Sequence, residues 1–407
     1  MKKTKLDQAF YKTMMTIAIP IVIQNIISIG LNMADTIMIG KLGVDELAAV
    51  GTANRLYFVF SSLCFGIYSG ASVYVSQYWG VKDIKNIRRT LGIDILLGGG
   101  MSVLFMVIAF FLAPQVLGLF SSDPNVIELG TQYLHIVAVS YFFTAMSFAI
   151  NFNCRAIHML KVPTAINTLA LFINLGLNYL LIFGKLGLPR MGVRGAALAT
   201  VISQAFSAAW VVGFLASSKA SLRLEKRYLR FDGSVVGPIF ALGAAPFVMA
   251  STESLVGFVL NGSLKNYGDI YVSTLTVLQS AIQFVSIPMA GFGQGIVPVV
   301  SYNYGHGSYD RVKQAFRIIV AVLFTFNFVM ILTMVMFPGA VASIFNDDPV
   351  LGEKVVHALP LFMTGMLIFG LQRACQNMFV ALGQAKTSLF IALLRKVILL
   401  IPLALIL

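Results

Sequence analysis

The feature that most restricts the fold of this chain is an internal repeat at one fixed offset of 225 residues, with no insertion along its length. Scattered identities arise easily by chance in an apolar chain, but a single shared offset over so long a stretch does not. A repeat of this kind predicts two copies of one structural body. The matched positions are Gly43, Gly66, Gly70, Ser76, Gly80, Phe120, Asp123, Pro124, Ala156 and Lys161, followed by Gly268, Gly291, Gly295, Ser301, Gly305, Phe345, Asp348, Pro349, Ala381 and Lys386.

The composition places both copies in a lipid bilayer. Of the 407 residues, 58% are hydrophobic and 11% are charged. Apolar runs such as Leu96–Ala113, Val235–Leu260 and Ile318–Met336 approach or exceed the ~18–20 residues that cross a membrane core. Two copies of one bundle in a membrane chain usually flank a central pathway with a binding site near mid-depth. The sequence therefore predicts a transporter.

The apolar segments predict an all-α membrane protein with eleven spans. Lys and Arg are concentrated on the connections that share a side with the basic N-terminus, which indicates that this side is cytoplasmic. The net charge of +13 therefore reflects membrane topology, and we expect no nucleic-acid partner. The expected spans are 13–38, 50–78, 91–113, 130–154, 164–184, 193–217, 235–262, 271–299, 317–339, 354–380 and 387–407.

These spans predict two lobes related by a pseudo-two-fold axis along the membrane normal. The N-lobe, 1–217, holds spans 1–6, the cytoplasmic linker is 218–234, and the C-lobe, 235–407, holds spans 7–11. The counterpart of the sixth span would begin near position 418, beyond the last residue. We expect that the twelfth span is absent because the chain is truncated.

Several kinds of chemistry find no support in the sequence. The three cysteines fall in apolar spans and the four histidines share no metal-ligand spacing. The chain has no P-loop, dinucleotide-binding glycine pattern or HExxH motif. We therefore expect neither an enzyme nor a resident cofactor or structural metal.

Polar side chains inside spans are expensive and identify the helix faces that meet protein or water. In span 1, Gln24, Ser28, Asn32 and Asp35 fall on one face, with Asp35 several residues from the outer end. An ionised carboxylate at mid-span costs roughly 2.5–3.5 kcal/mol, so Asp35 must line a wet cavity or carry a proton. Such a group suits coupled antiport; the alternative is a structural hydrogen bond to a neighbouring helix.

Other polar residues could surround Asp35 or only join helices. These are Asn167, Asn174 and Asn178 in span 5 and Thr144, Ser147, Asn151 and Arg155 in span 4. In the second lobe, Glu253 is the one deep acid, which favours a proton or cation role, and Asn261 lies on the same face of span 7. Gln279 and Gln283 are spaced by four in span 8. We expect these three polar residues to line the substrate cavity together with Gln24, Ser28 and Asn32. We expect Asp94 to be a boundary charge near the cytoplasmic end of span 3.

Basic and aromatic residues within the spans allow two interpretations. Arg395 and Lys396 interrupt the last apolar run, where they either form a structural pair or contact an anionic group in the cavity. Aromatic and Met side chains can form a soft wall for flat organic cations, although most such residues serve packing. The candidates for this wall include Tyr57, Tyr68 and Tyr141.

Several segments resemble the multidrug and toxic compound extrusion (MATE) family. They are Met33–Gly40, Gln77–Gly80 with the basic run to Arg89, Leu177–Leu180 through Gly195–Thr200, Ala381–Gly383, and Arg395–Val397 through Pro402. The resemblance covers nearly the whole chain. It implies a twelve-span antiporter that expels small cationic amphipathic compounds in exchange for H⁺ or Na⁺.

The resemblance also implies roles for individual residues. Asp35 matches the family's functional acid on span 1, and Asn151, Asn174 and Thr200 are similar to the polar cluster of the DinF-like branch. That branch has an aspartate where this chain has Asn178. Glu253 resembles the span 7 acid of the NorM-like branch, whose span 10 acid is replaced here by Leu371 or Gln372. The subfamily, and the choice between H⁺ and a Na⁺ ion near Asp35 or Glu253, stay open.

The leading hypothesis is thus an ion-coupled multidrug exporter, monomeric, in the plasma membrane. The rival is a flippase for lipid-linked saccharides on the same superfamily fold, which needs a basic cavity for phosphate groups. Arg55, Arg155, Arg395 and Lys396 are its candidates; their convergence on one face would favour the flippase.

Overall fold

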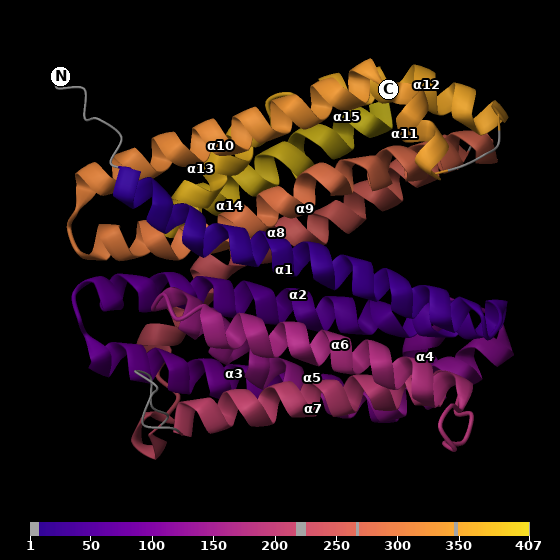
Figure 1. Ribbon diagram of the computed structural model, residues 1–407, viewed down its shortest axis with the longest axis horizontal. Helices are drawn as coiled ribbons and strands as arrows, with labels where there is room; N and C mark the ends of the chain where they lie inside the picture. The colour runs from indigo at the N-terminus through magenta and orange to yellow at the C-terminus, as the bar shows by residue number, and fades with distance from the viewer. Residues whose placement is uncertain (1–7, 217–224, 266–267, 346–348, 407) are drawn as a thin grey trace. The chain divides into compact units, whose positions relative to one another are not determined.

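The computed structural model describes residues 8–216, 225–265, 268–345 and 349–406. Within these ranges some side chains, including those of Glu253, Asn261 and Lys396, lie outside the described set. The regular structure of the described residues is helical (Figure 1). In chain order the helices are α1 Gln8–Gly40, α2 Val44–Gly80, α3 Ile84–Phe111, α4 Ala113–Gly118, α5 Pro124–Ala156, α6 Lys161–Phe183, α7 Val193–Ala216, η1 Lys226–Tyr228, α8 Gly233–Lys265, α9 Asp269–Gly305, α10 Tyr309–Met336, α11 Pro338–Phe345, α12 Pro349–Thr364, α13 Phe369–Ala381, α14 Ala385–Leu393, the π-helical η2 Leu394–Leu400, and α15 Ile401–Ile406.

Among the described residues, 8 helices are long and apolar enough to cross a membrane, or up to 9 when the bent pair α12 and α13 counts as one span. The all-α membrane fold predicted from the sequence is confirmed. Eleven spans were expected, and two of them account for the difference. In α8, only Gly233–Met249 counts as an apolar helix, and it is shorter than a full span. The other is the last segment. That segment is divided by η2, which carries Arg395.

The helix boundaries reproduce the repeat seen in the sequence. Shifted by 225 residues, α1, α2 and α3 coincide end for end with α8, α9 and α10. A side-chain contact is repeated as well: the Ser76 hydroxyl donates to the Ala156 carbonyl at 3.1 Å, and the Ser301 hydroxyl donates to the Ala381 carbonyl at 2.8 Å. The two copies therefore share helix lengths and an interhelical hydrogen bond.

The structure divides into two compact units, each described by itself. The N-terminal unit contains residues 26–243, and the C-terminal unit contains 1–25 together with 244–407. The lobe boundaries expected from the sequence, at 217 and 235, stay a prediction.

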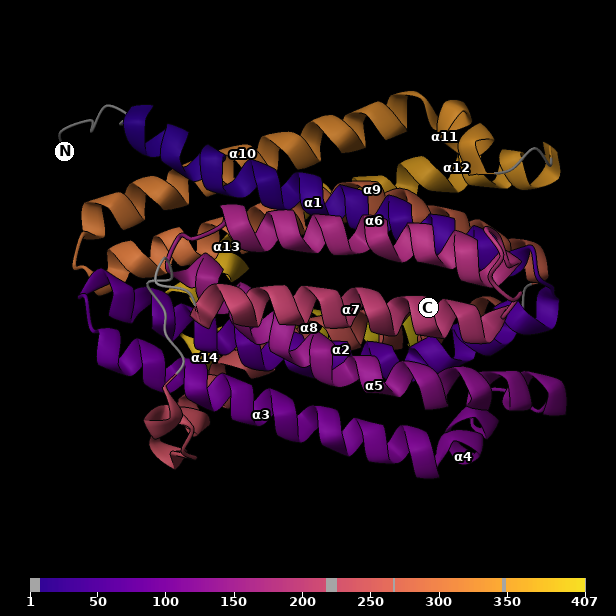
Figure 2. The same ribbon diagram turned by 60° about the horizontal axis from the view of Figure 1, so that its bottom comes forward.

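Helix α5 is the centre of the N-terminal unit and packs against α2, α3 and α7 (Figure 1). Helix α6 covers α7, and the two run alongside each other in Figure 2. Phe60 of α2 and Tyr141 of α5 are fully buried between these helices, with stacked rings 4.8 Å apart.

In each unit, two helices pack closely at a glycine, and the two glycines are related by the repeat. A Cβ on Gly70 of α2 would lie 2.5 Å from the Ile239 carbonyl oxygen at the start of α8. In the C-terminal unit, a Cβ on Gly295 of α9 would lie 2.6 Å from Cα of Ala18 in α1. Because no larger residue fits at either position, the first part of α8 packs on α2 as the first part of α1 packs on α9.

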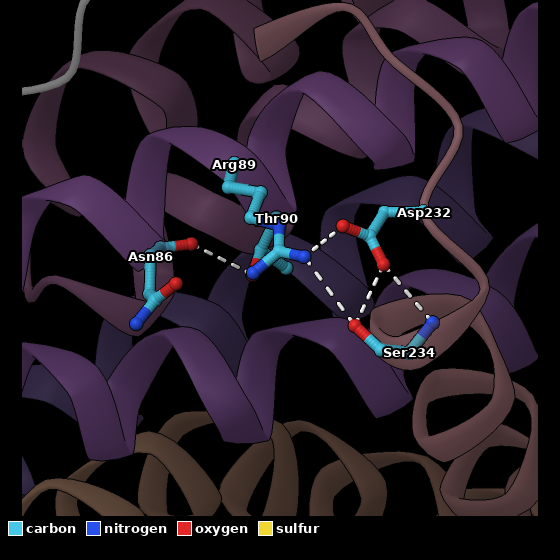
Figure 3. A network of polar contacts seen from close by, with 5 residues as sticks. All are labelled: Asn86, Arg89, Thr90, Asp232 and Ser234. Atoms are coloured by element: carbon cyan, nitrogen blue, oxygen red, sulfur yellow. Dashed lines mark hydrogen bonds and ion pairs between the residues drawn. The ribbon is translucent and has the colours of Figure 1, made fainter.

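The segment before α8 is held on α3 by polar contacts (Figure 3). In Figure 3, Arg89 pairs with Asp232 and reaches the Ser234 hydroxyl at 3.3 Å. Arg88 pairs with Glu225. All these side chains are partly exposed, so each ion pair contributes at most about 1 kcal/mol. The described part of the basic linker, from Glu225 onward, thus lies against the first turns of α3.

The span made by α12 and α13 is bent by 47°. The break at residues 365–368 leaves backbone carbonyls without helical partners, and the buried amide of Asn327 in α10 donates to those of Met366 and Leu367 at 3.1 and 3.0 Å. Broken helices inside a membrane need such partners. The matching part of α5 in the first copy is continuous.

Candidate functional site

The strongest candidate site is a chain of polar side chains that begins at Asp35. The Asn178 amide donates to Asp35 Oδ1 at 2.7 Å and to Asn174 Oδ1 at 3.2 Å. The Asn174 amide in turn lies 3.4 Å from the Thr200 hydroxyl. One series of polar side chains therefore joins helices α1, α6 and α7, and Asn178 of α6 contacts the carboxylate directly.

The sequence positions these groups through helical spacing. Asn174 and Asn178 are four residues apart and share a face of α6, so their amides form a ladder along the helix. Asp35 lies in the last turns of α1 and is half-buried, whereas Asn178 is buried. These polar side chains thus connect the partly accessible end of α1 with the interior of the N-terminal unit.

The chemistry of the polar side chains around Asp35 suits a proton or a small hard cation. Asp35 supplies the one formal charge, and Asn174, Asn178 and Thr200 supply neutral oxygens of the kind that alkali and alkaline-earth cations accept. Asn178 Oδ1 is buried and lacks a hydrogen-bond partner, so one acceptor is available beside the carboxylate. Within the part of the chain that is described, no group of three His, Cys, Asp or Glu residues could hold a metal ion.

One member of this neighbourhood was missed by the sequence reasoning. Tyr133 of α5 lies near Thr200 and Asp35. Its ring is buried in the core of the unit. Its position was detectable in principle, because Tyr133, Thr144 and Asn151 follow one face of α5 at spacings of eleven and seven residues, which are about three and two helical turns.

A second polar chain joins α5, α6 and α7. The Asn151 amide donates to the Ser147 carbonyl at 2.6 Å and to Asn167 Oδ1 at 3.3 Å. The Ser207 hydroxyl lies 3.4 Å from the same Asn167 oxygen and from Ser147 Oγ. These partners show that Asn151 takes part in helix-to-helix bonding; its role near Asp35 stays a prediction.

The expectation that Asp94 is a boundary charge is wrong. Asp94 is fully buried, and one of its oxygens accepts a hydrogen bond of 2.7 Å from the Asn153 amide. Hydropathy placed the residue near the end of a span, but the packing of α3 against α5 turns its side chain into the interior.

The three tyrosines expected to form a cavity wall lie in the packed interior of the N-terminal unit. Tyr68 and Tyr141 are fully buried and belong to its main hydrophobic cluster. Tyr57 is half-buried and its ring lies 5.8 Å from that of Tyr141. The proposal that these rings meet a substrate stays a prediction.

The remaining span 1 residues differ in environment. Ser28 is half-buried and Asn32 is exposed in the N-terminal unit, whereas Gln24 is buried and belongs to the C-terminal unit. No common site can be drawn through all of them.

In the C-terminal unit the predicted residues are spread over several helices. Gln279 of α9 is half-buried and lies 3.7 Å from the position that a Cβ on Gly257 would take, whereas Gln283 is exposed. The Arg395 guanidinium donates to Gln372 at 2.6 Å and lies 5.4 Å from the centroid of the Phe369 ring. The side chains of Glu253 and Asn261 lie outside the described residues.

The fold and this site define a class: a multi-span membrane protein built from two copies of one bundle, with a carboxylate-centred site in one copy. Comparison with known proteins agrees with this class. A family model described as MatE matches residues 20–180 and 246–406, once in each copy. The chain belongs to the MatE family of membrane transporters, and it is not an enzyme.

Curated relatives match most of the chain. A probable multidrug resistance protein, YoeA, from Bacillus subtilis (strain 168) is 24% identical over 373 residues, which cover 91% of this chain and 80% of that protein. The multidrug export protein MepA of Staphylococcus aureus (strain MRSA252) is 23% identical over 393 residues, covering 95% and 85%.

Solved structures show the same fold. The MATE multidrug transporter DinF-BH is 28% identical, with a TM-score of 0.88 over 99% of this chain and 90% of that one. An outward-facing MATE family transporter of the MOP superfamily gives a TM-score of 0.88 at 19% identity, covering 100% and 91%. The resemblance to the MATE family noted in the sequence is therefore confirmed, with the subfamily open.

Proposed function

We propose that this chain is a multidrug efflux antiporter that exports small cationic amphipathic compounds in exchange for H⁺ or Na⁺. The observation that carries the proposal is the hydrogen bond of 2.7 Å from the Asn178 amide to Asp35. A neutral donor orients the carboxylate without neutralising it, so its negative charge is available to a proton, an ion or a substrate cation. Relatives named as a probable multidrug resistance protein and as a multidrug export protein support drugs as the class of substrate.

The coupling would follow from exclusive occupancy of Asp35. A carboxylate that is half-buried in a membrane protein is costly while it is charged and uncompensated. Either an inward-moving ion or an outward-moving organic cation removes that cost, and each would stabilise a different access state of the two lobes. Only such a difference in affinity between states can shift the equilibrium between them.

The flippase alternative lacks support in the N-terminal unit. Helices α2 and α5 run in the same direction, since Ala49 lies beside Gly130 and Ser76 beside Ala156. Arg55 is therefore separated from Arg155 by about 20 residues along the helix axis, or about 30 Å. Two cations this far apart do not form one phosphate site.

The same proposal includes the expected setting of the protein. A multi-pass transporter of this kind would act as a monomer in the plasma membrane with its N-terminus in the cytoplasm. The excess of Lys and Arg on that side supports the orientation.

The test is transport of ethidium by the full chain in sealed vesicles, with the pH gradient and the sodium gradient imposed separately. We expect one gradient to drive export and the other to have no effect. Export that needs neither gradient would contradict the antiport mechanism.

Glu253 is proposed as a second coupling group because it is an acid within α8. Glu253→Gln should change the pH or sodium dependence of ethidium export. An unchanged dependence would assign Glu253 to packing.

A further inference from the structure

A second buried carboxylate lies in the N-terminal unit outside the Asp35 chain. Asp94 of α3, Asn153 of α5 and Tyr68 of α2 are each 0% exposed. The Asn153 amide donates to Asp94 Oδ2 at 2.7 Å and to the Ala149 carbonyl at 2.8 Å. Three helices thus bring these polar side chains together beside the main hydrophobic cluster of the unit.

The hydrogen bonds fix the orientation of the Asn153 amide. Its nitrogen faces two acceptors, Asp94 Oδ2 and the Ala149 carbonyl, and a reversed amide would place oxygen against both. The oxygen of Asn153 and the second oxygen of Asp94 are therefore both acceptors. Each is buried and has no hydrogen-bond partner, and the Tyr68 hydroxyl is in the same condition.

The repeat shows that the scaffold does not require this cluster. The positions 225 residues after Asp94 and Asn153 are Ile319 and Met378, both buried and apolar, and the counterpart of Tyr68 is Gly293. The second copy builds the corresponding helices, α10 and α13, without any polar group at these positions. A function specific to the first copy is the simplest reason for a buried acid there.

We propose that Asp94 and Asn153 form a second proton-binding site, separate from Asp35, with the proton on the Asp94 carboxyl. One proton turns an unpartnered acceptor of the pair into a donor and removes the formal charge from the core. An unpaired buried acceptor costs about 1–3 kcal/mol and a buried charge costs more. A single proton thus removes the larger of these two costs, the buried charge.

The groups around Asp94 agree with a neutral acid. From α2 it faces Tyr68, whose neighbour is the Cys64 thiol, a weak hydrogen-bonding group. From α5 it faces Asn153, followed by Cys154 and by Arg155, whose guanidinium lies 5.7 Å from the centroid of the Phe152 ring. Helix α4 carries no titratable residue.

The remaining element packed on α3 is η1. It meets α3 through the Tyr228 backbone at Gly92 and, one turn earlier, through the ion pair of Arg88 with Glu225. The environment of the Asp94 carboxyl itself is set by burial and by the Asn153 amide.

The space at the cluster suits a proton better than a hydrated ion. The Tyr68 hydroxyl occupies the place where a Cβ on Gly98 would lie, so the helices α2 and α3 are in close contact one turn after Asp94. A closely packed interior of this kind leaves no room for an ion with its ligand shell, whereas a proton adds no volume.

The experiment is infrared difference spectroscopy of the purified full chain in lipid nanodiscs, titrated with acid and base. The spectrum of the wild type minus Asp94→Asn should show the carbonyl stretch of a protonated carboxylic acid near neutral pH. Asp35→Asn should keep this band. Absence of the band near neutral pH, or its loss on adding sodium at constant pH, would overturn the proposal.

A second variant covers the case in which Asp94→Asn does not fold. In Asn153→Leu the acid stays in place but loses its amide partner, so the same carbonyl band should persist and move to higher frequency. An unmoved band would show that the acid is not paired with Asn153 and would also overturn the site.

Discussion

The two copies of the repeat agree in their scaffold and differ in their polar groups. Three helices, α1, α2 and α3, have the same lengths as α8, α9 and α10, and both copies have the same serine-to-carbonyl bond between repeat-related helices. The second copy has counterparts for three residues of the Asp35 chain. Asp35 corresponds to Leu260, Asn174 to Leu399 and Asn178 to Leu403. Since leucine serves at these positions in the second copy, the bundle does not need the polar chain for folding, and its presence in the first copy indicates function.

The second copy has its own specialisation. Its α12 and α13 are bent where the corresponding α5 is straight, and Asn327 supplies donors for the break at a position where the first copy has Ser102. The two copies thus share the serine bond and the close glycine approach, whereas the Asp35 site is found in the first copy and the bent span in the second.

The strongest loss of transport should come from removing the Asp35 carboxylate, whose counterpart in the second copy is Leu260. Asp35→Asn should abolish export of ethidium from cells, because the amide can neither release a proton nor hold a cation. The matched control is Asp45→Asn, an exposed acid in the first turn of α2, which should export normally. Normal export by Asp35→Asn, at wild-type abundance in the membrane, would remove Asp35 from the mechanism.

The next effect tests whether the packing is equivalent in the two copies. Gly70→Ala and Gly295→Ala each place a Cβ within 2.6 Å of neighbouring backbone, so each should destabilise the protein by about 1–3 kcal/mol. Gly100→Ala is the control, because nothing lies within 4 Å of its Cβ position. Thermal unfolding in detergent measures the losses, and a large loss in only one copy would break the equivalence.

A smaller effect is expected when the first copy is made to resemble the second at one position. Asn178→Leu removes the donor to Asp35 and reproduces Leu403. A hydrogen bond to a charged group is worth about 1.5–3 kcal/mol, so the rate of ethidium export should fall about tenfold. Tyr179→Leu, at an exposed neighbour on α6, should leave the rate unchanged; equal rates in both variants would contradict a role for Asn178.

The smallest effect concerns the repeated serine bonds. Ser76→Ala and Ser301→Ala each remove one buried hydroxyl bond and should lower the free energy of unfolding by about 1 kcal/mol. The double variant should show the sum of the two losses, because the bonds share no partner. A loss in one variant and none in the other would show that the bond does not stabilise the two copies equally.

The sequence predicted those features that depend on chain-local patterns. The offset of 225 fixed which helices are equivalent, and the spacing of Asn174 and Asn178 placed both amides on one face of α6. The hydrogen bond between Asn178 and Asp35 agrees with the expectation that span 5 approaches Asp35.

Features that depend on how helices rotate against one another could not be read from the sequence. The partner of Asp94 is 59 residues away, and hydropathy along α3 carries no information about it. Tyr133 was missed for the same reason, because an aromatic residue in an apolar span looks like ordinary packing until Thr200 is placed beside it.

In the proposed mechanism, Asp35 is a single site that an inorganic ion and an organic cation occupy in turn. The decisive measurement is the Kd of ethidium for the purified full chain in nanodiscs, with the proton and sodium concentrations varied separately. The mechanism predicts that one of these ions weakens ethidium binding to the wild type and has no such effect on Asp35→Asn. The same ion dependence in both proteins would contradict it.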